Sequence, residues 1–366
     1  MIRASCVICE HSVLRDIFTL HKYPITPSSS TQDVSTDEYE DCIFATCAVC
    51  GSVQLKTLVD PIKLYKDSHN STENTPTWKE HHRLFAEFIR EHSNTTALLE
   101  IGGNSGTLYA HLSNTINDYT ILDICDSDRR PSSITFIQGN CESFDLSGHA
   151  DVVLSHVFEH LYSPRRFIEN MSRGRVQSVY ISIPNMEHLY ASKNISVLHN
   201  EHTFFVGEHE IRYMFSLNGY VCSSIRPFKN HSTFYKFILD ESSTPLTLYR
   251  DMDRSITISS YMTKFENSLK DIIVDRPCFI CPAGHYGQKI YYYLQKYREQ
   301  MMGFIDNDPS KQGKRVYGTP LHVFSPGVLD AYTDKSICIV LFAGPYREEL
   351  KAQLNTIHNN IIYIDI

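Results

Sequence analysis

The strongest constraint in this sequence is a glycine-rich turn placed between a short apolar run and a helical pattern. Residues 97–101 (ALLEI) have the length and composition of a buried strand, residues 102–106 (GGNSG) form the turn, and residues 107–112 continue as a helix. Small residues in such a turn let the backbone approach a ligand closely, and the start of the helix offers amide donors. The segment therefore predicts a ligand-binding strand–turn–helix unit.

Strands and helices alternate around this unit. A helical pattern that begins at Thr77 precedes the turn, and the short apolar runs that predict strands lie at 97–101, 119–124, 134–137, 152–154 and 179–183. A second series begins near residue 250, with helices expected at 259–273 and 289–298 and strands at 278–281, 302–305, 337–342 and 360–364. Such alternation predicts an α/β fold with parallel sheets that helices cover on both faces.

The length of 366 residues favours two or three domains, and 42% hydrophobic with 21% charged residues is typical of globular proteins. The N-terminal residues lack the apolar run of a signal peptide, and no segment approaches the roughly 20 apolar residues that span a bilayer. We therefore expect a cytoplasmic protein without a membrane partner, in which the sequons at Asn70 and Asn194 are chance matches. A net charge of −8 argues against a nucleic-acid partner.

Two CxxC pairs stand near the N-terminus, Cys6 with Cys9 and Cys47 with Cys50. Each pair presents two thiolates from a tight turn, and four cysteines complete a tetrahedral, structural Zn²⁺ site with no position left for a reactive water. Cys42 is a possible substitute ligand. The polar stretch 26–40 predicts a loop, and we expect little core in this N-terminal region without the metal as a cross-link.

Further polar residues follow the expected strands of the central region. Asp123 ends the second strand, where a carboxylate can accept hydrogen bonds from two ribose hydroxyls. Asn140 and Cys141 follow the third strand, where an adenine edge would be read, and His156 follows the fourth. Ligands in open α/β folds collect at this carboxyl edge of the sheet. A nicotinamide-binding domain is the alternative, although Glu100 stands where the dinucleotide fingerprint would have a glycine.

These residues resemble the class I methyltransferases that use S-adenosyl-L-methionine, whose first motif is Glu/Asp-x-Gly-x-Gly-x-Gly. Here Glu100, Gly102 and Gly106 match the motif, while Asn104 replaces the middle glycine. Asparagine is the residue that best tolerates left-handed backbone angles after glycine. The resemblance implies that these residues, with Asp123, Asn140, Cys141 and His156, bind the cofactor.

Glu-Ile-Gly-x-Asn-x-Gly narrows the resemblance to methyltransferases that act on nucleotide-linked deoxysugars. Those enzymes also begin with a CxxC…CxxC zinc module, and residues 305–320 look like part of their third domain. The family implies a zinc module at 1–75, a central Rossmann-like methyltransferase domain at 76–248, and a C-terminal Rossmann-like α/β domain at 249–366 that holds the nucleotide-sugar. Its oligomeric state is left open, with a monomer plausible.

The reaction chemistry of the family maps onto residues 199–202 (HNEH), which look like its Tyr-x-Glu-His. By that match His202 is the base, Glu201 orients it or binds a sugar hydroxyl, and His156 faces the sugar. His199 replaces the family tyrosine, and residues 65–71 (YKDSHNS) replace a segment rich in tyrosine and serine. The acceptor atom therefore stays open among carbon, nitrogen and oxygen. His160 is interpreted as a helix residue that supports the fold.

The turn at Gly284, His285 and Tyr286, together with Asp306, is a candidate for binding the nucleotide-sugar, or else an ordinary strand-to-helix turn. Two other functions stay open. One is a zinc-ribbon RNA methyltransferase, against which the acidic charge and the second αβ series count. The other is a cofactor-binding scaffold without activity, against which the retained Glu100, Gly102, Gly106 and Asp123 count.

Overall fold

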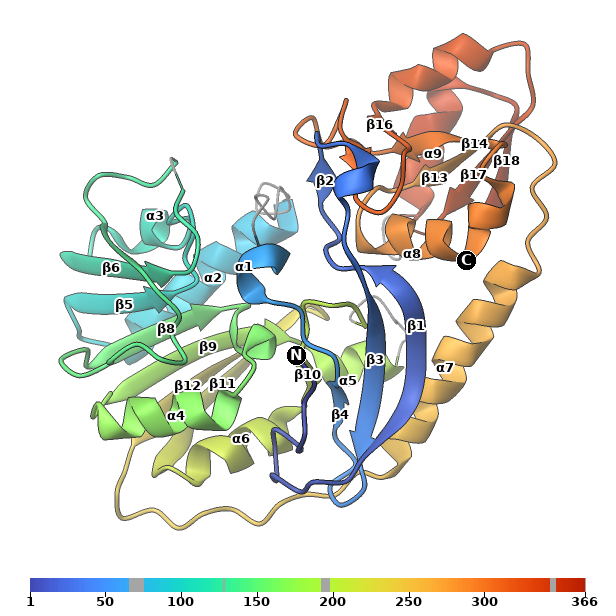
Figure 1. The fold of residues 1–366 in the computed structure, drawn as a ribbon. Helices are drawn as coiled ribbons and strands as arrows, with labels where there is room; N and C mark the ends of the chain where they lie inside the picture. Colours follow the sequence, from blue (N-terminus) through green and yellow to red (C-terminus); the bar gives the residue numbers. More distant parts are fainter. Residues whose placement is uncertain (66–75, 128, 192–197, 343–346, 366) are drawn as a thin grey trace.

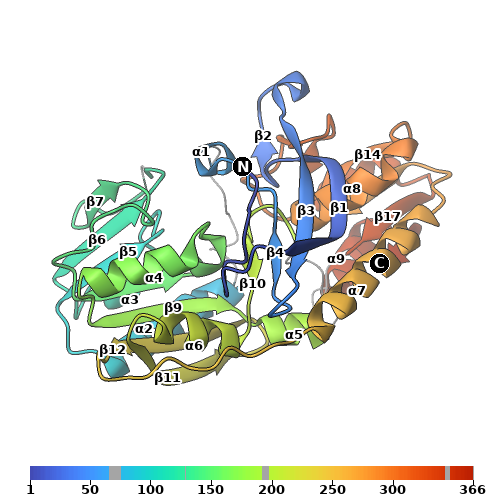
Figure 2. The ribbon, with the colours of Figure 1, turned by 60° about the horizontal axis from the view of Figure 1, so that its bottom comes forward.

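The computed structural model describes residues 1–65, 76–127, 129–191, 198–342 and 347–365. Three sheets of four, seven and five strands organise these residues, together with a two-stranded pairing. In Figures 1 and 2 the seven-stranded and five-stranded sheets lie on opposite sides of the molecule, with the N-terminal strands between them. Among the described residues, no helix is long and apolar enough to cross a membrane.

The central sheet has the strand order β11-β12-β9-β8-β5-β6-β7. Strands β5 to β9 pair in parallel, whereas β12 is antiparallel to both of its neighbours. The strands are β5 (Ala97–Ile101), β6 (Asp118–Asp123), β7 (Thr135–Gln138), β8 (Asp151–Ser155), β9 (Ser178–Pro184), β11 (Tyr220–Phe228) and β12 (Ser232–Leu239). The five parallel strands were expected from the sequence; the hairpin of β11 and β12 was not.

Helices cover both faces of the central sheet because alternate strand residues point to opposite sides. Leu98 and Val153 belong to one apolar cluster, which includes residues of α2 (Pro76–His92) and α3 (Tyr109–Leu112). Leu99 belongs to a second cluster, with residues of α4 (Pro164–Arg173) and α6 (Glu208–Ser216). The parallel strands are thus buried on both faces, and their carboxyl ends form one edge.

The N-terminal strands form a four-stranded antiparallel sheet. Its order is β1 (Leu14–Pro24), β3 (Tyr39–Cys47), β4 (Val53–Leu55) and β10 (Phe204–Phe205). Leu20 and Phe44 are buried in one apolar cluster with Met262 and Ile290 of the C-terminal region. The hairpin of β1 and β3 therefore shares an apolar core with helices that follow it by more than 200 residues in the chain, and the dependence of this region on the metal stays a prediction.

The C-terminal sheet is parallel, with the order β16-β14-β13-β17-β18. Its strands are β13 (Cys278–Cys281), β14 (Met301–Ile305), β16 (Val323–Phe324), β17 (Ile337–Leu341) and β18 (Ile361–Asp365), and its helices are α7 (Asp253–Lys270), α8 (His285–Leu294) and α9 (Arg347–Ile357). Helix α8 begins four residues before the expected start at 289, directly after Gly284. The remaining elements are short: α1 (Pro61–Leu64), α5 (Met186–Ala191), η1 (Val34–Thr36), η3 (Phe158–His160), η5 (Gln295–Tyr297) and η6 (Pro326–Tyr332).

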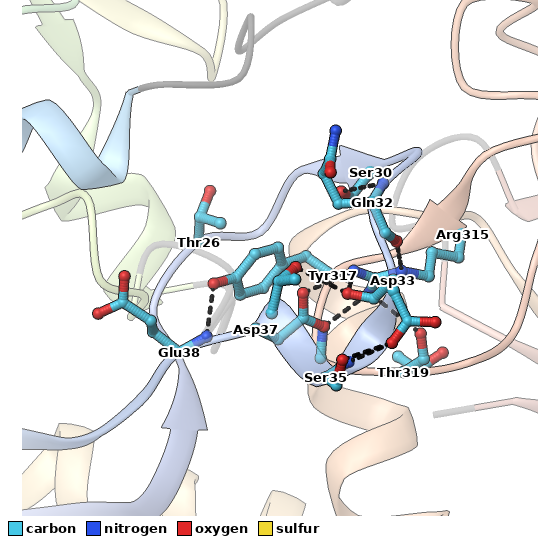
Figure 3. A network of polar contacts seen from close by, with 12 residues as sticks. Thr26, Ser30, Gln32, Asp33, Ser35, Asp37, Glu38, Arg315, Tyr317 and Thr319 are labelled. Carbon is cyan, nitrogen blue, oxygen red and sulfur yellow. Dashed lines mark hydrogen bonds and ion pairs between the residues drawn. The ribbon is translucent and has the colours of Figure 1, made fainter.

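A buried ion pair ties the segment 26–40 to the C-terminal region (Figure 3). Both terminal nitrogens of Arg315 donate to the Asp37 carboxylate at 2.6 Å, and the Asp37 and Arg315 side chains are 0% and 6% exposed. The Tyr317 hydroxyl accepts a hydrogen bond from the Glu38 amide at 2.7 Å. Beside them β2 (Ser29–Ser30) pairs with β15 (Arg315–Val316). The stretch expected to be a loop therefore carries specific contacts and two short elements.

Candidate functional site

The glycine-rich turn leaves β5 at the carboxyl edge of the central sheet. The Gly102 amide donates to the carbonyl of Leu122 at 2.9 Å, which continues the pairing of β5 with β6. Asn104 and Gly106 have φ angles of 43° and 79°. These left-handed angles suit glycine and asparagine, as the sequence predicted. The Asn104 amide donates to Oδ2 of Asp123 at 3.0 Å, so the turn is fastened to the end of the neighbouring strand.

Glu100 lies beneath this turn. Its side chain is 3% exposed, and the Tyr119 hydroxyl donates to its Oε2 at 2.7 Å. A Cβ added to Gly103 would lie 2.5 Å from the same oxygen, so only glycine fits above the carboxylate. The structure therefore places Glu100 as the support of the turn's backbone.

Asp123 carries a second carboxylate that contacts the turn, through the Asn104 amide. Its second oxygen accepts a hydrogen bond from the Cys125 amide at 3.0 Å. Burial raises the pKa of Asp123, and the amide hydrogen bonds oppose that shift by favouring the charged form. A carboxylate has about four acceptor positions. The amide donors therefore leave acceptor capacity on this carboxylate for a hydroxyl donor of a ligand.

Asn140 and Cys141 follow β7 in the next loop along this edge. The Gly139 amide donates to the carbonyl of Asp123 at 2.9 Å, which places this loop beside the end of β6. Asn140 is exposed, and its Oδ1 accepts from the Glu142 amide at 2.9 Å. Cys141 is partly buried, and burial raises the pKa of its thiol. The loop that carries both residues therefore lies beside the end of β6, where Asp123 is.

His156 follows β8 with a φ of 54°. Its ring packs edge-on against Trp78 at 4.7 Å and His81 at 5.1 Å, and its Nε2 lies 2.8 Å from the Ser232 hydroxyl. Burial, followed by the charge of His231, lowers its pKa well below the usual range. The His156 ring therefore packs between α2 and β12, and its burial favours the neutral form.

A second cluster, here called the histidine–glutamate cluster, consists of Glu159, His160, His199, Glu201, His202 and His285. The loop 199–202 contributes three members, and η3 contributes Glu159 and His160. The rings of His202 and His160 have centroids 5.0 Å apart, and those of His202 and His199 are 4.2 Å apart. The structure thus brings together His199, Glu201 and His202, which the sequence nominated.

Burial favours the neutral form of two imidazoles in this cluster, those of His199 and His202. Burial is the largest cause that lowers the pKa of His199 and of His202 well below the usual range. Burial also raises the pKa of Glu159 to about 7. Neither carboxylate oxygen of Glu159 makes a hydrogen bond within the described residues, although Nδ1 of His156 lies 3.2 Å from Oε1. A neutral imidazole such as His202 can accept a proton.

His160 belongs to the cluster, although the sequence did not nominate it for the site, and Tyr65 contacts it from outside the cluster. The Tyr65 hydroxyl lies 2.8 Å from Nδ1 of His160. As expected, His160 is a helical residue: it lies in the single 3-10 turn η3 that follows the carboxyl end of β8. That position, directly after a parallel strand, was the signal available in the sequence. Of the segment 65–71, residues 66–71 lie outside the described residues.

The loop 199–202 is anchored in the N-terminal sheet. The next residue, Thr203, accepts hydrogen bonds at its carbonyl from the Leu55 amide at 2.9 Å and from Nη1 of Arg3 at 2.6 Å. The Asn200 side-chain amide donates to the carbonyl of Pro24 at 2.7 Å. Strand β10 then pairs with β4. The position of the loop therefore depends on the N-terminal strands.

The four C-terminal candidates lie in different places. Gly284, with a φ of 138°, precedes α8, and the His285 ring stacks on His199 with centroids 4.0 Å apart. Tyr286 instead packs against Phe342 at 4.2 Å. Asp306 is 8% exposed and accepts from Lys311 Nζ at 2.9 Å. Of these residues, His285 is the one that the structure brings to the loop 199–202.

The four cysteine thiols of the CxxC pairs converge. Their sulfurs lie within 4.8 Å of one another, with Cys6 and Cys50 at 3.6 Å and Cys9 and Cys47 at 3.5 Å. Sulfurs bound 2.3 Å from one tetrahedral zinc ion are about 3.8 Å apart, so the set fits the ion. Amides of Ile8 and Val49 donate to Cys6 and Cys47 at 3.4 Å each. Cys42 belongs to a different apolar cluster, the one that also contains Leu20 and Phe44, and is therefore not part of this set.

Comparisons with known proteins give fold likeness only. No protein-family model and no curated protein matches this sequence. Among solved structures, the chain is similar to magnesium protoporphyrin IX methyltransferase from Synechocystis PCC 6803 with bound SAH, at 14% identity and a TM-score of 0.38 over 48% of this chain and 91% of that one. It is also similar to the N-methyltransferase NodS from Bradyrhizobium japonicum WM9 with bound SAH, at 14% identity and a TM-score of 0.36 over 46% and 90%.

Proposed function

We propose that this protein is an S-adenosyl-L-methionine-dependent methyltransferase that acts on a nucleotide-linked deoxysugar. The observation that supports it most is the fastening of the glycine-rich turn to Asp123 through the Asn104 amide, 3.0 Å from Oδ2. That contact holds a carboxylate with spare acceptor capacity beside backbone that can approach a ligand closely. A ribose diol with an adjoining charged amino-acid tail is a ligand suited to this pair.

Methyl transfer moves the carbon from a positively charged sulfonium to a nucleophile of the acceptor, and the cofactor leaves as a neutral thioether. The protein's part is to align the two centres and to remove the acceptor's proton. We assign the base to His202, where burial lowers the pKa and the charge of the neighbouring Glu201 raises it by favouring the protonated imidazole. Glu201 precedes it in the same loop and is 3% exposed.

A nucleotide-linked sugar is the acceptor that the order of motifs along the chain favours. The three segments that carry those motifs, 1–75, 76–248 and 249–366, are our proposed domains. His285, at the start of α8, lies against His199, so a ligand near His202 would meet the C-terminal segment as well. With His199 in place of the family's tyrosine, the acceptor atom is to be decided by product analysis.

We also propose that Cys6, Cys9, Cys47 and Cys50 hold a structural zinc ion. Cys6, Cys47 and Cys50 are 2% exposed or less, and their cluster joins the N-terminal residues to the core of the central sheet. The ion would cross-link the two CxxC turns. A Cβ on Gly51 would lie 2.0 Å from the Asp251 carbonyl, so the second turn packs directly on the chain that leads to α7.

The experiment that tests the proposal has two arms. Isothermal calorimetry of the full chain with S-adenosyl-L-methionine tests the cofactor, and an assay with dTDP-, UDP- and GDP-linked 4-keto and 4-amino sugars tests the acceptor, with the product mass and NMR spectrum as readouts. We expect saturable cofactor binding and one methylated sugar class. Binding without any methylated product would refute the sugar acceptor, whereas the absence of heat at submillimolar cofactor would refute the methyltransferase itself.

A further inference from the structure

Within the described residues, three groups of side chains have potential metal-ligand atoms within 4.8 Å of one another. The first is the four-cysteine set. The second, Glu159 with His160 and His202, contains the proposed base. The third consists of His199, Glu201 and His285, and no part of the proposed reaction yet uses His199 or His285. This third group joins the loop 199–202 to the first turn of α8.

The Glu201 carboxylate lies close to one nitrogen of each of the two stacked imidazoles of the third group. Its Oε2 is 3.8 Å from Nδ1 of His199 and 3.6 Å from Nε2 of His285. Ligand atoms about 2.0 to 2.2 Å from one metal ion are roughly 3 to 3.5 Å apart. A closure of a few tenths of an ångström would bring the carboxylate oxygen and either nitrogen to the separation of two ligands on one ion, and a rotation of one of the two stacked rings would turn both nitrogens toward it.

The burial of the group suits a bound cation. The side chains of His199 and Glu201 are 7% and 3% exposed, so a charged carboxylate here is costly without positive charge close by. Lys289, also buried, donates to the carbonyl of Leu198 at 2.6 Å, directly before the loop 199–202. The His285 side chain is 33% exposed, which leaves a side of the group open to solvent.

His199 is the position at which this chain departs from the tyrosine of the family it resembles. The departure replaces a phenol with an imidazole at this position. The ring of His285 stacks on that imidazole, with ring centroids 4.0 Å apart, and contributes a second imidazole to the group. Two imidazoles with one carboxylate form a set that binds zinc and ferrous ions in proteins while leaving coordination positions open.

We propose that His199, Glu201 and His285 bind one divalent first-row transition-metal ion, separate from the four-cysteine site. His202 is outside this ligand set, with its ring 4.2 Å from that of His199. An open coordination position would face an oxygen donor of the acceptor, whose hydroxyl or carbonyl the ion would polarise beside the base. This last role rests on the proposed function; the binding of the metal does not.

The test is a cobalt titration of the full chain, loaded beforehand with one equivalent of zinc so that the thiolates are occupied. Visible absorption reports the coordination of Co²⁺, and gel filtration followed by metal analysis gives the amount retained. We expect one retained cobalt per chain, with d–d bands and without the intense charge-transfer band of cobalt thiolate. No S-adenosyl-L-methionine or sugar is present, so the outcome is independent of methyl transfer.

Two ligand variants and one control complete the design. His285→Ala and Glu201→Gln should each weaken cobalt binding at least tenfold, the first by removing a partly exposed ring and the second by removing charge with little change of shape. His209→Ala is the matched control, because that ring stacks on Tyr249 outside the group. No retained cobalt in the unaltered protein, or unchanged affinity in folded His285→Ala and Glu201→Gln, would overturn the proposal.

Discussion

The amide of Asn104 and the carboxylate of Asp123 are 3.0 Å apart, although 18 other residues separate them in the sequence. The contact is possible because β5 and β6 are parallel neighbours whose carboxyl ends share an edge. It fixes the left-handed turn at Asn104 and holds the Asp123 carboxylate at the same point. The cofactor site that we propose depends on this one junction.

His202→Gln tests the base. Glutamine keeps hydrogen-bonding groups but cannot accept the proton, so we expect kcat to fall by roughly 100-fold or more. Cofactor affinity should stay unchanged, because the loop 199–202 is separate from the turn after β5. Turnover by rapid-quench assay and binding by calorimetry check the two parts. Retained turnover would remove His202 from the reaction, and His209→Gln serves as the control.

Cys6→Ser tests the zinc site and its link to the acceptor loop. The CxxC turns adjoin the sheet that contains β4 and β10, and β4 hydrogen-bonds to Thr203. The Cys6→Ser substitution should therefore release about one zinc ion per chain and lower turnover. Binding of S-adenosyl-L-methionine should persist. Cys222→Ser, on β11, is the control. A folded Cys6→Ser protein that no longer binds the cofactor would contradict this division of roles.

Asp37→Asn tests the buried pair with Arg315. Removing one partner leaves a guanidinium that is 6% exposed without its counter-charge, so unfolding should become easier by about 3 to 5 kcal/mol. Urea denaturation measures the change. Glu241→Gln breaks the exposed pair with Arg175, in which both side chains are more than 60% exposed, and should cost under about 1 kcal/mol. Equal costs for the two variants would mean that Arg315 is hydrated.

Glu159→Gln tests a pH dependence of stability. Burial raises the pKa of Glu159 from 4.5 to about 7, and the titratable groups near it are His156, His160, His202 and Tyr65. Below pH 4.5 the residue is protonated in both the folded and the unfolded chain. As the pH rises from 4.5 to about 7 the unfolded chain ionises first, so the unaltered protein should lose on the order of 3 kcal/mol.

The glutamine variant has no such proton to lose, so its stability should exceed that of the unaltered protein by more at pH 8 than at pH 5. Urea midpoints at the two pH values measure this difference. Parallel pH profiles for the two proteins would show that Glu159 is hydrated in the folded state.

The sequence predicted the parallel strands of the central sheet because each is a short apolar run that ends in a polar or glycine-containing turn. The sequence also indicated that Asn104 and Asp123 lie close together. Asn104 follows β5, and Asp123 ends β6, which is the neighbouring parallel strand. The cysteine set was equally accessible, because CxxC spacing fixes two thiols per turn.

Contacts between distant segments were not accessible in this way. The hairpin of β1 and β3 is buried by residues of α7 and α8. No pattern in the polar stretch 26–40 predicts that Asp37 pairs with Arg315. The position of His160 depends on a single turn that no periodicity marks. His285 meets His199 only because two separate segments pack together.

The most direct test of the central claim is calorimetric titration of S-adenosyl-L-methionine into the unaltered protein, Asp123→Asn and Asp118→Asn. Asp118 begins the same strand at its exposed end, so its variant controls for changes to β6. We predict saturable binding to the unaltered protein and to Asp118→Asn, with at least tenfold weaker binding to Asp123→Asn. Equal affinity for all three proteins, or no binding to any of them, would contradict the cofactor site proposed at the turn after β5.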